Sequence, residues 1–215
     1  MRDIAKFING FKAFQDNYFC GDEEVFQRLR SGQNPRALLI GCCDSRVDPA
    51  ILTNSAPGDL FVIRNVANLV PPCEDDGGHH GVSAALEFAV RVLLVEHVIV
   101  MGHSACGGIR SLMRGEFGQA RDFLPRWVDI MAPARERVLR ELPDKSPELQ
   151  ERACEQAAVL VSLDNLLTFP WVRERVETGS LLLHGWYFDL ERGELLSYLP
   201  QSGQFEPLVP RCEAG

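Results

Sequence analysis

The chain has 215 residues, of which 46% are hydrophobic and 24% charged, a composition that suits one globular domain with a substantial core. Its net charge of -8 disfavours nucleic acid as a partner, because binding phosphates requires clustered lysine and arginine. No apolar run reaches the roughly 18 residues that a membrane span needs, so no membrane partner is expected.

The first predicted element is an amphipathic helix over residues 1–19. Its apolar side chains recur at helical spacing, namely at Ile4, Phe7, Ile8, Phe11, Phe14 and Tyr18. A second short helix is expected over residues 23–30, followed by a turn over 32–35. We expect residues 1–31 to form an N-terminal helical arm whose apolar face packs against another surface.

Three short, continuous apolar runs predict strands that are buried on both faces, at residues 37–40, 60–63 and 98–101. Helical periodicity over residues 82–95 and 107–113 places one helix before the third strand and one after it. Because strands alternate with helices, the sequence predicts an α/β fold with a parallel sheet and right-handed crossovers.

The second half of the chain is mostly helical at first, over residues 123–168, with a break near 143–147. Two late strands are expected at residues 181–183 and 195–199, with a turn at Arg192 and Gly193 between them.

No internal repeat or low-complexity linker divides the sequence, so residues 1–215 are interpreted as one domain. Within it we expect a core over residues 33–199 and a C-terminal tail over 200–215. The first residues lack the apolar segment of a signal peptide, and the seven cysteines are an odd number. A cytoplasmic location is therefore expected.

Two cysteine–histidine motifs follow the first and third predicted strands. Cys42-x-Asp44-x-Arg46 comes after the first strand, and His103-x-x-Cys106 comes after the third. Because the carboxyl ends of parallel strands line one crevice, these residues can meet around a single ion. Two thiolates and one imidazole suit zinc, and three protein ligands leave a fourth tetrahedral position open, as in catalytic zinc sites.

Either motif by itself is more often structural, and their joint position after two buried strands is what favours a metal site. A structural zinc site would need a fourth cysteine or histidine ligand, and none matches. Cys43 should point away from its neighbour on an extended backbone. The remaining candidates lie in other sequence contexts, namely Cys20, Cys73, His79 and His80.

Taken together, these motifs resemble the two signatures of the β-class carbonic anhydrases. The resemblance extends through residues 57–61, 64–68, 81–88 and 183–186, and it covers residues 33–199. It implies a mixed, mainly parallel central β-sheet flanked by helices, with the N-terminal helical arm packing on a neighbouring subunit. It also implies a lyase that hydrates CO2 reversibly to bicarbonate and a proton, using zinc-bound hydroxide and one zinc per chain.

The resemblance gives the acidic and basic residues of the first motif distinct roles. Asp44 would orient the zinc-bound hydroxide, and Arg46 would hold Asp44 through a charge-assisted pair. In a closed state known in the family, Asp44 itself becomes the fourth zinc ligand. The plain alternative is an ordinary surface ion pair between Asp44 and Arg46.

A small, mostly apolar substrate pocket is also implied. Its expected members are Gln33 near the substrate, Phe61 as an aromatic wall, Phe88 contributed from a neighbouring subunit, and the backbone N–H groups of Gly107 and Gly108. The family resemblance places the active site at a dimer interface, and we expect a dimer or a dimer of dimers.

The sequence departs from one subgroup of the family, whose regulatory bicarbonate pocket uses a tryptophan, an arginine and a tyrosine. Here these positions hold Leu39, Arg64 and Phe188, so we expect that pocket to be absent. No histidine is clearly placed as a proton shuttle, although His79 and His80 are candidates on an exposed loop.

The sequence also bears on three other functions. A zinc nucleobase deaminase would need a Pro-Cys-x-x-Cys motif, and the second cysteine after Cys73 is missing. A hydrolase of carbon disulfide or carbonyl sulfide on the same scaffold would use the same ligands and stays open. A zinc-bound protein without turnover is disfavoured by the intact pair of Asp44 and Arg46.

Overall fold

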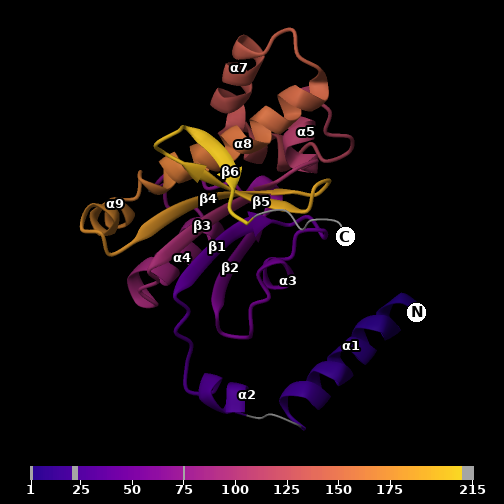
Figure 1. Ribbon diagram of the computed structural model, residues 1–215, viewed down its shortest axis with the longest axis vertical. Coiled ribbons are helices and arrows are strands. Elements are labelled where there is room, and N and C mark those ends of the chain that lie inside the picture. The colour runs from indigo at the N-terminus through magenta and orange to yellow at the C-terminus, as the bar shows by residue number, and fades with distance from the viewer. Residues whose placement is uncertain (1, 21–23, 75, 210–215) are drawn as a thin grey trace.

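The computed structural model describes residues 2–20, 24–74 and 76–209, and its elements are labelled in Figure 1. The strands are β1 (Ala37–Cys42), β2 (Leu60–Asn65), β3 (His97–His103), β4 (Leu182–Asp189), β5 (Glu194–Leu199) and β6 (Gln204–Pro207). The α-helices are α1 (Arg2–Tyr18), α2 (Glu24–Leu29), α3 (Pro49–Thr53), α4 (Gly81–Glu87), α5 (Gly107–Arg114), α6 (Leu124–Val128), α7 (Ala132–Glu141), α8 (Pro147–Leu166) and α9 (Pro170–Glu177). Short helical turns of other types are η1 (Val66–Asn68), η2 (Phe88–Val92) and η3 (Asp129–Met131).

The strands form one mixed sheet in the order β2-β1-β3-β4-β5-β6. The first four of these strands are parallel, while β5 and β6 add antiparallel to β4. The mixed, mainly parallel sheet flanked by helices is therefore confirmed. Because β1 and β3 are neighbours in the middle of the parallel part, their carboxyl ends lie side by side, which decides where the functional site forms.

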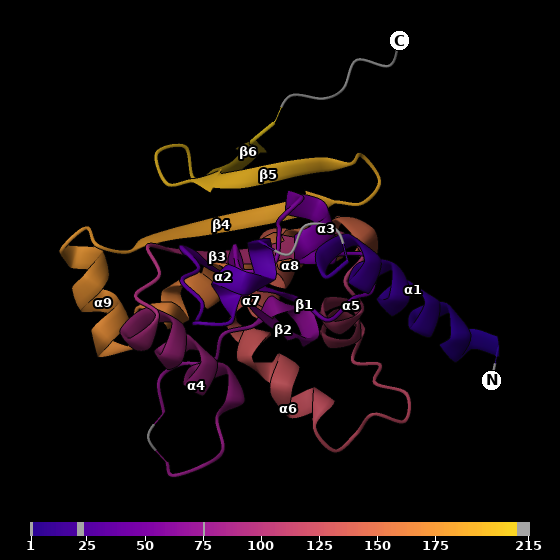
Figure 2. The ribbon, with the colours of Figure 1, turned by 90° about the horizontal axis from the view of Figure 1, so that it is seen from below.

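Alternation along the central strands divides the core between two faces of the sheet. Leu38 and Ile40 of β1 point to a large apolar cluster that includes residues of α4, α8 and α9. Leu39 points to the opposite face, where Leu52 of α3 covers it. Figure 2 shows the same division, with α4 and α9 on one side of the strands and α3 on the other.

Two predicted strands differ from expectation in place or length, and one further strand was not predicted. β2 is an edge strand, so it is only partly covered, and Val62 is 40% exposed. β4 runs on through Asp189, well beyond the three leucines that predicted it. The expected C-terminal tail contains β6, which pairs with β5; residues 210–215 of that tail lie outside the described residues.

The predicted helices are present, with shifted ends. The helix expected over residues 82–95 is α4 followed by the π-helical turn η2, and it stops before Leu94, which has φ 56°. The helix expected over residues 23–30 is α2, and Glu23 lies outside the described residues. In the described part of the chain, no helix is both long and apolar enough to cross a bilayer.

The N-terminal helix α1 stands apart from the sheet (Figure 1). It is joined to α2 by a cluster of aromatic rings in which Phe14 contacts Tyr18, Phe19 and Phe26. The remainder of its apolar face has no cover within this chain: Phe7 is 69% exposed, and three further apolar residues are similarly exposed, namely Ile4, Ile8 and Phe11. The described structure therefore leaves an unpartnered apolar surface on the arm.

Candidate metal centre

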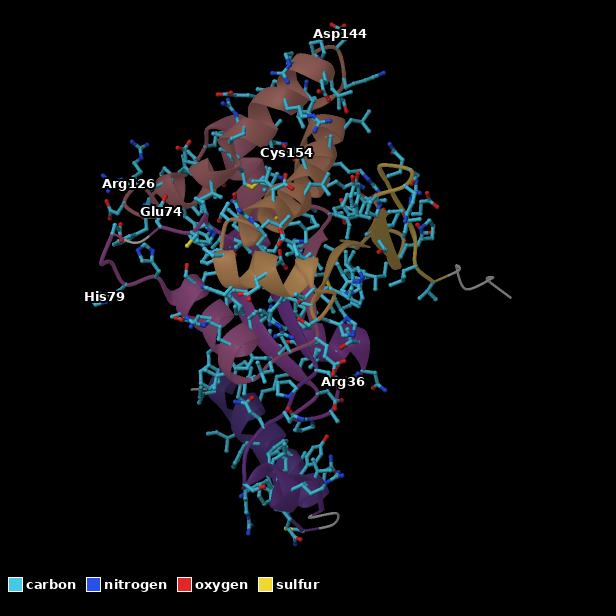
Figure 3. All side chains as sticks on the ribbon, turned by 90° about the vertical axis from the view of Figure 1, so that its left-hand side faces the viewer. Arg36, Glu74, His79, Arg126, Asp144 and Cys154 are labelled. Carbon is cyan, nitrogen blue, oxygen red and sulfur yellow. The ribbon has the colours of Figure 1, made fainter. Side chains whose placement is uncertain are left out.

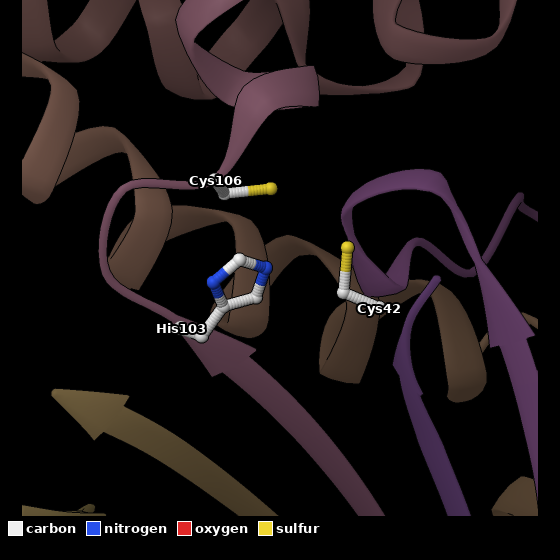
Figure 4. A group of neighbouring side chains, drawn as sticks. All are labelled: Cys42, His103 and Cys106. Atoms are coloured by element: carbon white, nitrogen blue, oxygen red, sulfur yellow. The ribbon is translucent and has the colours of Figure 1, made fainter. Parts of the chain in front are cut away.

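Two neighbouring strands deliver the three predicted ligands to one point. Cys42 is the last residue of β1, His103 is the last residue of β3, and Cys106 caps the N-terminus of α5. The ligand atoms of these three buried residues lie within 4.8 Å of one another, and no other such group occurs in the described residues. Figure 4 shows both sulfur atoms and the imidazole ring converging on the same space.

The pKa values of the two neighbouring thiols are shifted in opposite directions, and a cation between the sulfurs would favour the thiolate form of both. The pKa of Cys42 is lowered to about 4, chiefly because the Cys106 thiol donates to its sulfur. The pKa of Cys106 is raised, because the Cys42 thiolate and burial both oppose a second negative charge. The backbone N–H of Asp44 donates to the Cys42 sulfur at 3.4 Å, and the backbone N–H groups of Ala67, Gly108 and Ile109 act to lower the pKa values of the two thiols. These donors stabilise thiolates, the forms that bind metal.

The imidazole of His103 is held in the tautomer that a metal ligand requires. Its Nδ1 lies 2.9 Å from the carbonyl oxygen of Ser104, so Nδ1 carries the proton and Nε2 keeps its lone pair. That Nε2 atom is fully buried and has no hydrogen-bond partner. A buried nitrogen without a partner beside two thiols fits the donor set of a borderline-soft ion such as zinc.

Asp44 lies two residues after the ligand Cys42, and its side chain is held by Arg46. Arg46 binds its carboxylate as a two-pronged fork, with Nε 2.9 Å from Oδ1 and Nη2 2.7 Å from Oδ2. The Arg46 N–H adds a third bond to Oδ1 at 3.0 Å. These contacts hold the pKa of Asp44 well below its usual range, chiefly through the Arg46 side chain. The pair is therefore a charged, bidentate unit.

Arg64 forms hydrogen bonds with the loop that carries Cys42. Its Nε donates to the Cys42 carbonyl at 2.9 Å, and its Nη2 donates to the Asp44 carbonyl at 2.7 Å. Its Nη1 lies 2.8 Å from Oδ2 of Asp48, which caps α3. All three nitrogen atoms of this guanidinium therefore help to hold the loop that presents Cys42 and Asp44.

The two predicted glycines have different surroundings. A side chain at Gly108 would come within 2.7 Å of Val66 and 3.2 Å of Ala67, whereas one at Gly107 would meet nothing within 4 Å. Gly108 is therefore needed because α5 packs tightly against η1. Gly102 serves packing too, since a side chain there would come within 2.8 Å of Val159 on α8.

The other three predicted pocket residues do not reach the centre within one chain. Gln33 precedes β1 and lines a small depression with Leu29 and Gly58, while Cys42 ends the same strand. Six residues of strand separate these points by roughly 17–20 Å. The ring centroids of Phe61 and Phe88 lie 5.9 Å apart, and Phe88 is 42% exposed.

The two loop histidines line a groove of about 770 Å³ next to the Cys42 loop. Glu74, His79 and Arg126 lie on its rim (Figure 3), and Cys43 also lines it. His80 pairs with Asp76, and this contact raises the pKa of His80. Neither histidine forms a hydrogen bond with a ligand of the centre in the described structure, so a shuttle role stays a prediction.

One residue that contacts the metal-binding turn, Glu155, could not be identified from the sequence. Glu155 of α8 accepts hydrogen bonds from the backbone N–H of Cys106 at 2.9 Å and from the hydroxyl of Tyr187 at 2.7 Å. In the sequence, Glu155 sits in a helix with acids at regular spacing, which is typical of a solvated face. Its burial, at 4% exposure, appears only in the folded chain.

Comparison with protein families matches residues 37–195 to the family described as carbonic anhydrase. The chain is 40% identical over 193 residues to beta carbonic anhydrase 3 of Arabidopsis thaliana, covering 88% of this chain and 74% of the relative. It is 37% identical over 198 residues to a carbonic anhydrase of Synechocystis, covering 91% of this chain and 71% of the relative.

Solved structures agree with this assignment. The β-carbonic anhydrase CcaA superposes with a TM-score of 0.88 at 34% identity, covering 98% of this chain and 94% of that one. One of two tetrameric β-carbonic anhydrases of Sordaria macrospora superposes with a TM-score of 0.71 at 29% identity, covering 98% and 96%. The similarity therefore extends to the N-terminal and C-terminal elements as well as the central sheet.

Proposed function

Because the chain belongs to the β-class carbonic anhydrases, zinc enzymes that catalyse CO2 hydration, we propose that Cys42, His103 and Cys106 hold the zinc ion. The observation that carries this assignment is the buried, unpartnered Nε2 of His103 within 4.8 Å of two thiols. When bound, zinc lowers the pKa of a coordinated water and so supplies hydroxide near neutral pH.

Metal analysis and X-ray absorption test this ligand set directly. We expect about one zinc per chain, with two sulfur neighbours near ~2.3 Å and one nitrogen near ~2.0–2.1 Å. Cys42→Ser and Cys106→Ser should each lose zinc, whereas Cys43→Ser is the matched control and should retain it. An all-nitrogen shell, or full zinc content in Cys106→Ser, would contradict the assignment.

Asp44 and Arg46 are proposed to position the reacting groups. The fork holds the Asp44 carboxylate ionised and fixed in place, and we propose that this carboxylate accepts a hydrogen bond from the attacking oxygen. Arg46 also donates to the carbonyl of Ala105 at 3.1 Å, so one guanidinium ties the loops of both strands together. The hydrogen bond that Asp44 accepts from the attacking oxygen would therefore have a fixed direction.

We further propose that the substrate pocket is completed by a second copy of the chain. Gln33, Phe61 and Phe88 lie far from the metal ligands of their own chain, so they can line the CO2 pocket only if contributed by a partner copy. The exposed apolar face of α1 supports the same association, since Phe7 and Phe11 have no cover within the chain. We propose a homodimer or a dimer of dimers.

Mixing two inactive variants tests the shared pocket. In a dimer of one Asp44→Asn chain and one Gln33→Leu chain, one site carries both changes and the other carries neither. Random exchange of inactive homodimers should therefore restore about a quarter of wild-type activity. No recovery after verified exchange would show that each chain holds a complete site of its own.

A cytoplasmic location is proposed on chemical grounds. Cys42 and Cys106 must stay reduced to bind a metal, and the described cysteines are free thiols. The relatives do not supply a location, because one of them is a chloroplastic enzyme. Cell fractionation with an antibody to the protein would locate it.

A stopped-flow assay of CO2 hydration on zinc-loaded protein measures the activity directly. We expect rapid hydration of CO2, abolished in Cys106→Ser. Carbonyl sulfide, tested in parallel, should be a poor substrate. Faster turnover of carbonyl sulfide than of CO2 would reassign the chain to hydrolysis of CO2 analogues on the same scaffold.

A further inference from the structure

The turn between β3 and α5 carries two of the three zinc ligands and is strained at its middle residue. Ala105 has φ 57°, in the left-handed region, where the Cβ of an alanine lies too close to the following carbonyl oxygen. Such a conformation persists only where surrounding contacts hold it. The positions of His103 and Cys106 therefore depend on groups outside the turn.

Most of those groups come from the adjacent strand and from Arg46. The N–H of Ser104 donates to the carbonyl of Phe188 at 2.9 Å, and the hydroxyl of Ser104 accepts from the N–H of Leu190 at 2.8 Å. Arg46 donates to the carbonyl of Ala105. These bonds fix the first half of the turn.

The second half is fixed by a buried carboxylate. Glu155 accepts from the Cys106 N–H through Oε1 and from the Tyr187 hydroxyl through Oε2. Tyr187 is fully buried, and Glu155 forms no ion pair with any of the described residues. Burying a carboxyl group without a cation is costly, and an apolar side chain would fill the same space at less cost. A specific role for its oxygen atoms explains why a carboxyl group stands there.

We propose that Glu155 is a positioning residue of the zinc centre: anchored by Tyr187, it fixes the Cys106 peptide so that this sulfur faces His103 and Cys42. The inference rests on the zinc site proposed above. Glu155 acts through Cys106 and contacts neither the metal nor the substrate. Its two oxygen atoms link α8 and β4 to the first turn of α5, so the ligand position is set by three elements at once.

A purely structural role is the alternative, and the chain provides a matched control for it. Glu151 lies one turn earlier on α8, is buried to a similar extent, and also binds α5, through Arg110 at 3.3 Å and Arg114 at 2.6 Å. Among the described residues, it forms no hydrogen bond with the turn that holds the ligands. Loss of Glu151 therefore weakens the packing of α5 on α8 without touching Cys106.

The test measures the rate at which zinc-loaded protein releases zinc to an excess of a chromogenic chelator. Glu155→Leu should release zinc about 10- to 100-fold faster than wild type, the usual cost of losing a group that orients a ligand. Glu155→Gln should stay near the wild-type rate, because its amide oxygen still accepts from Cys106 and its NH2 can donate to Tyr187. Tyr187→Phe should fall between them, and Glu151→Leu should match wild type.

A second readout uses cobalt in place of zinc. The thiolate-to-cobalt absorption bands should change in Glu155→Leu and remain unchanged in Glu155→Gln and Glu151→Leu. Wild-type release and spectrum in Glu155→Leu, or equally fast release from Glu151→Leu, would overturn the proposal.

Two further outcomes are distinguishable. If Glu155→Leu does not fold, the comparison of Tyr187→Phe with Glu151→Leu decides: faster release from Tyr187→Phe supports the proposal, and equal rates refute it. If the wild-type protein itself holds no zinc, the proposed metal centre fails, and not the role of Glu155 alone.

Discussion

Arg46 binds both carboxylate oxygens of Asp44 in a fork. A carboxylate released beside zinc is a good oxygen ligand. At the scale of single residues, we therefore propose that this pair keeps Asp44 off the metal and the fourth coordination position open.

Removing the fork should close the site. Arg46→Ala should keep its zinc but lose about 10- to 100-fold in activity, as Asp44 turns to the metal. Arg46→Lys should lose activity too, because a lysine cannot bind both oxygens in a fork. Zinc content, hydration rate and X-ray absorption would be measured together, and a new oxygen neighbour is expected in Arg46→Ala. Near-normal turnover in that variant would show that Arg46 is dispensable.

A second residue-scale prediction concerns the histidine pair at the other end of the sheet. His184 Nε2 lies 3.1 Å from His97 Nδ1, and burial together with the charge of His97 lowers the pKa of His184. The unfolded chain therefore binds a proton at His184 more readily than the folded chain does. The stability that neutral His184 contributes is present above about pH 6.5 and is lost as pH falls towards the lowered pKa.

Urea unfolding at pH 7.5 and pH 5.5 measures this linkage. The fall in unfolding free energy between the two values should be smaller in His184→Gln than in wild type. His79→Gln, on the exposed loop, is the control and should show the wild-type difference. An equal fall in wild type and His184→Gln would refute the linkage.

At the scale of elements, the metal centre depends on how closely α5 approaches η1. The backbone N–H of Ala67 in η1 acts to lower the pKa of Cys42, and that of Gly108 in α5 acts to lower the pKa of Cys106, so both elements border the metal centre. Only a glycine permits that approach, because a side chain at residue 108 would come within 2.7 Å of Val66.

Alanine substitutions at adjacent positions separate this effect from helix propensity. Gly108→Ala should lower the unfolding free energy by about 1–3 kcal/mol through overpacking and speed zinc release. Gly107→Ala, which meets open space, should be neutral or slightly stabilising. Thermal unfolding and chelator competition would measure both. Equal behaviour of the two variants would show that the close packing does not constrain the centre.

At the scale of the whole molecule, the arm and the metal centre should depend on one another through the partner copy. Deleting residues 1–19 removes the exposed apolar face of α1, so assembly and activity should fall together. Analytical ultracentrifugation and CO2 hydration would be measured on the same samples. Lys6→Ser with Lys12→Ser changes α1 without removing apolar groups and should leave both properties intact. A truncated, monomeric and fully active enzyme would contradict the prediction.

Much of the fold and the ligand set could be predicted from the sequence alone. Continuous apolar runs identified the central parallel strands, because strands covered on both faces tolerate few polar residues. Cys42, His103 and Cys106 were identifiable because metal chemistry restricts residue type, and because strand ends in a parallel sheet meet at one edge. The edge position of β2 and the strand β6 were not predicted, because local hydrophobic periodicity does not determine which strands lie next to one another.

Only the tertiary structure decided which polar groups support the ligands. Glu155 and Cys106 are 49 residues apart, and Glu155 resembles a surface acid in sequence until α8 packs over the sheet. The structure also places Gln33, Phe61 and Phe88 away from the ligands of their own chain, because β1 separates its two ends by its full length. Residue chemistry is local and can be read along the chain, whereas the contacts that orient it arise from packing between distant segments.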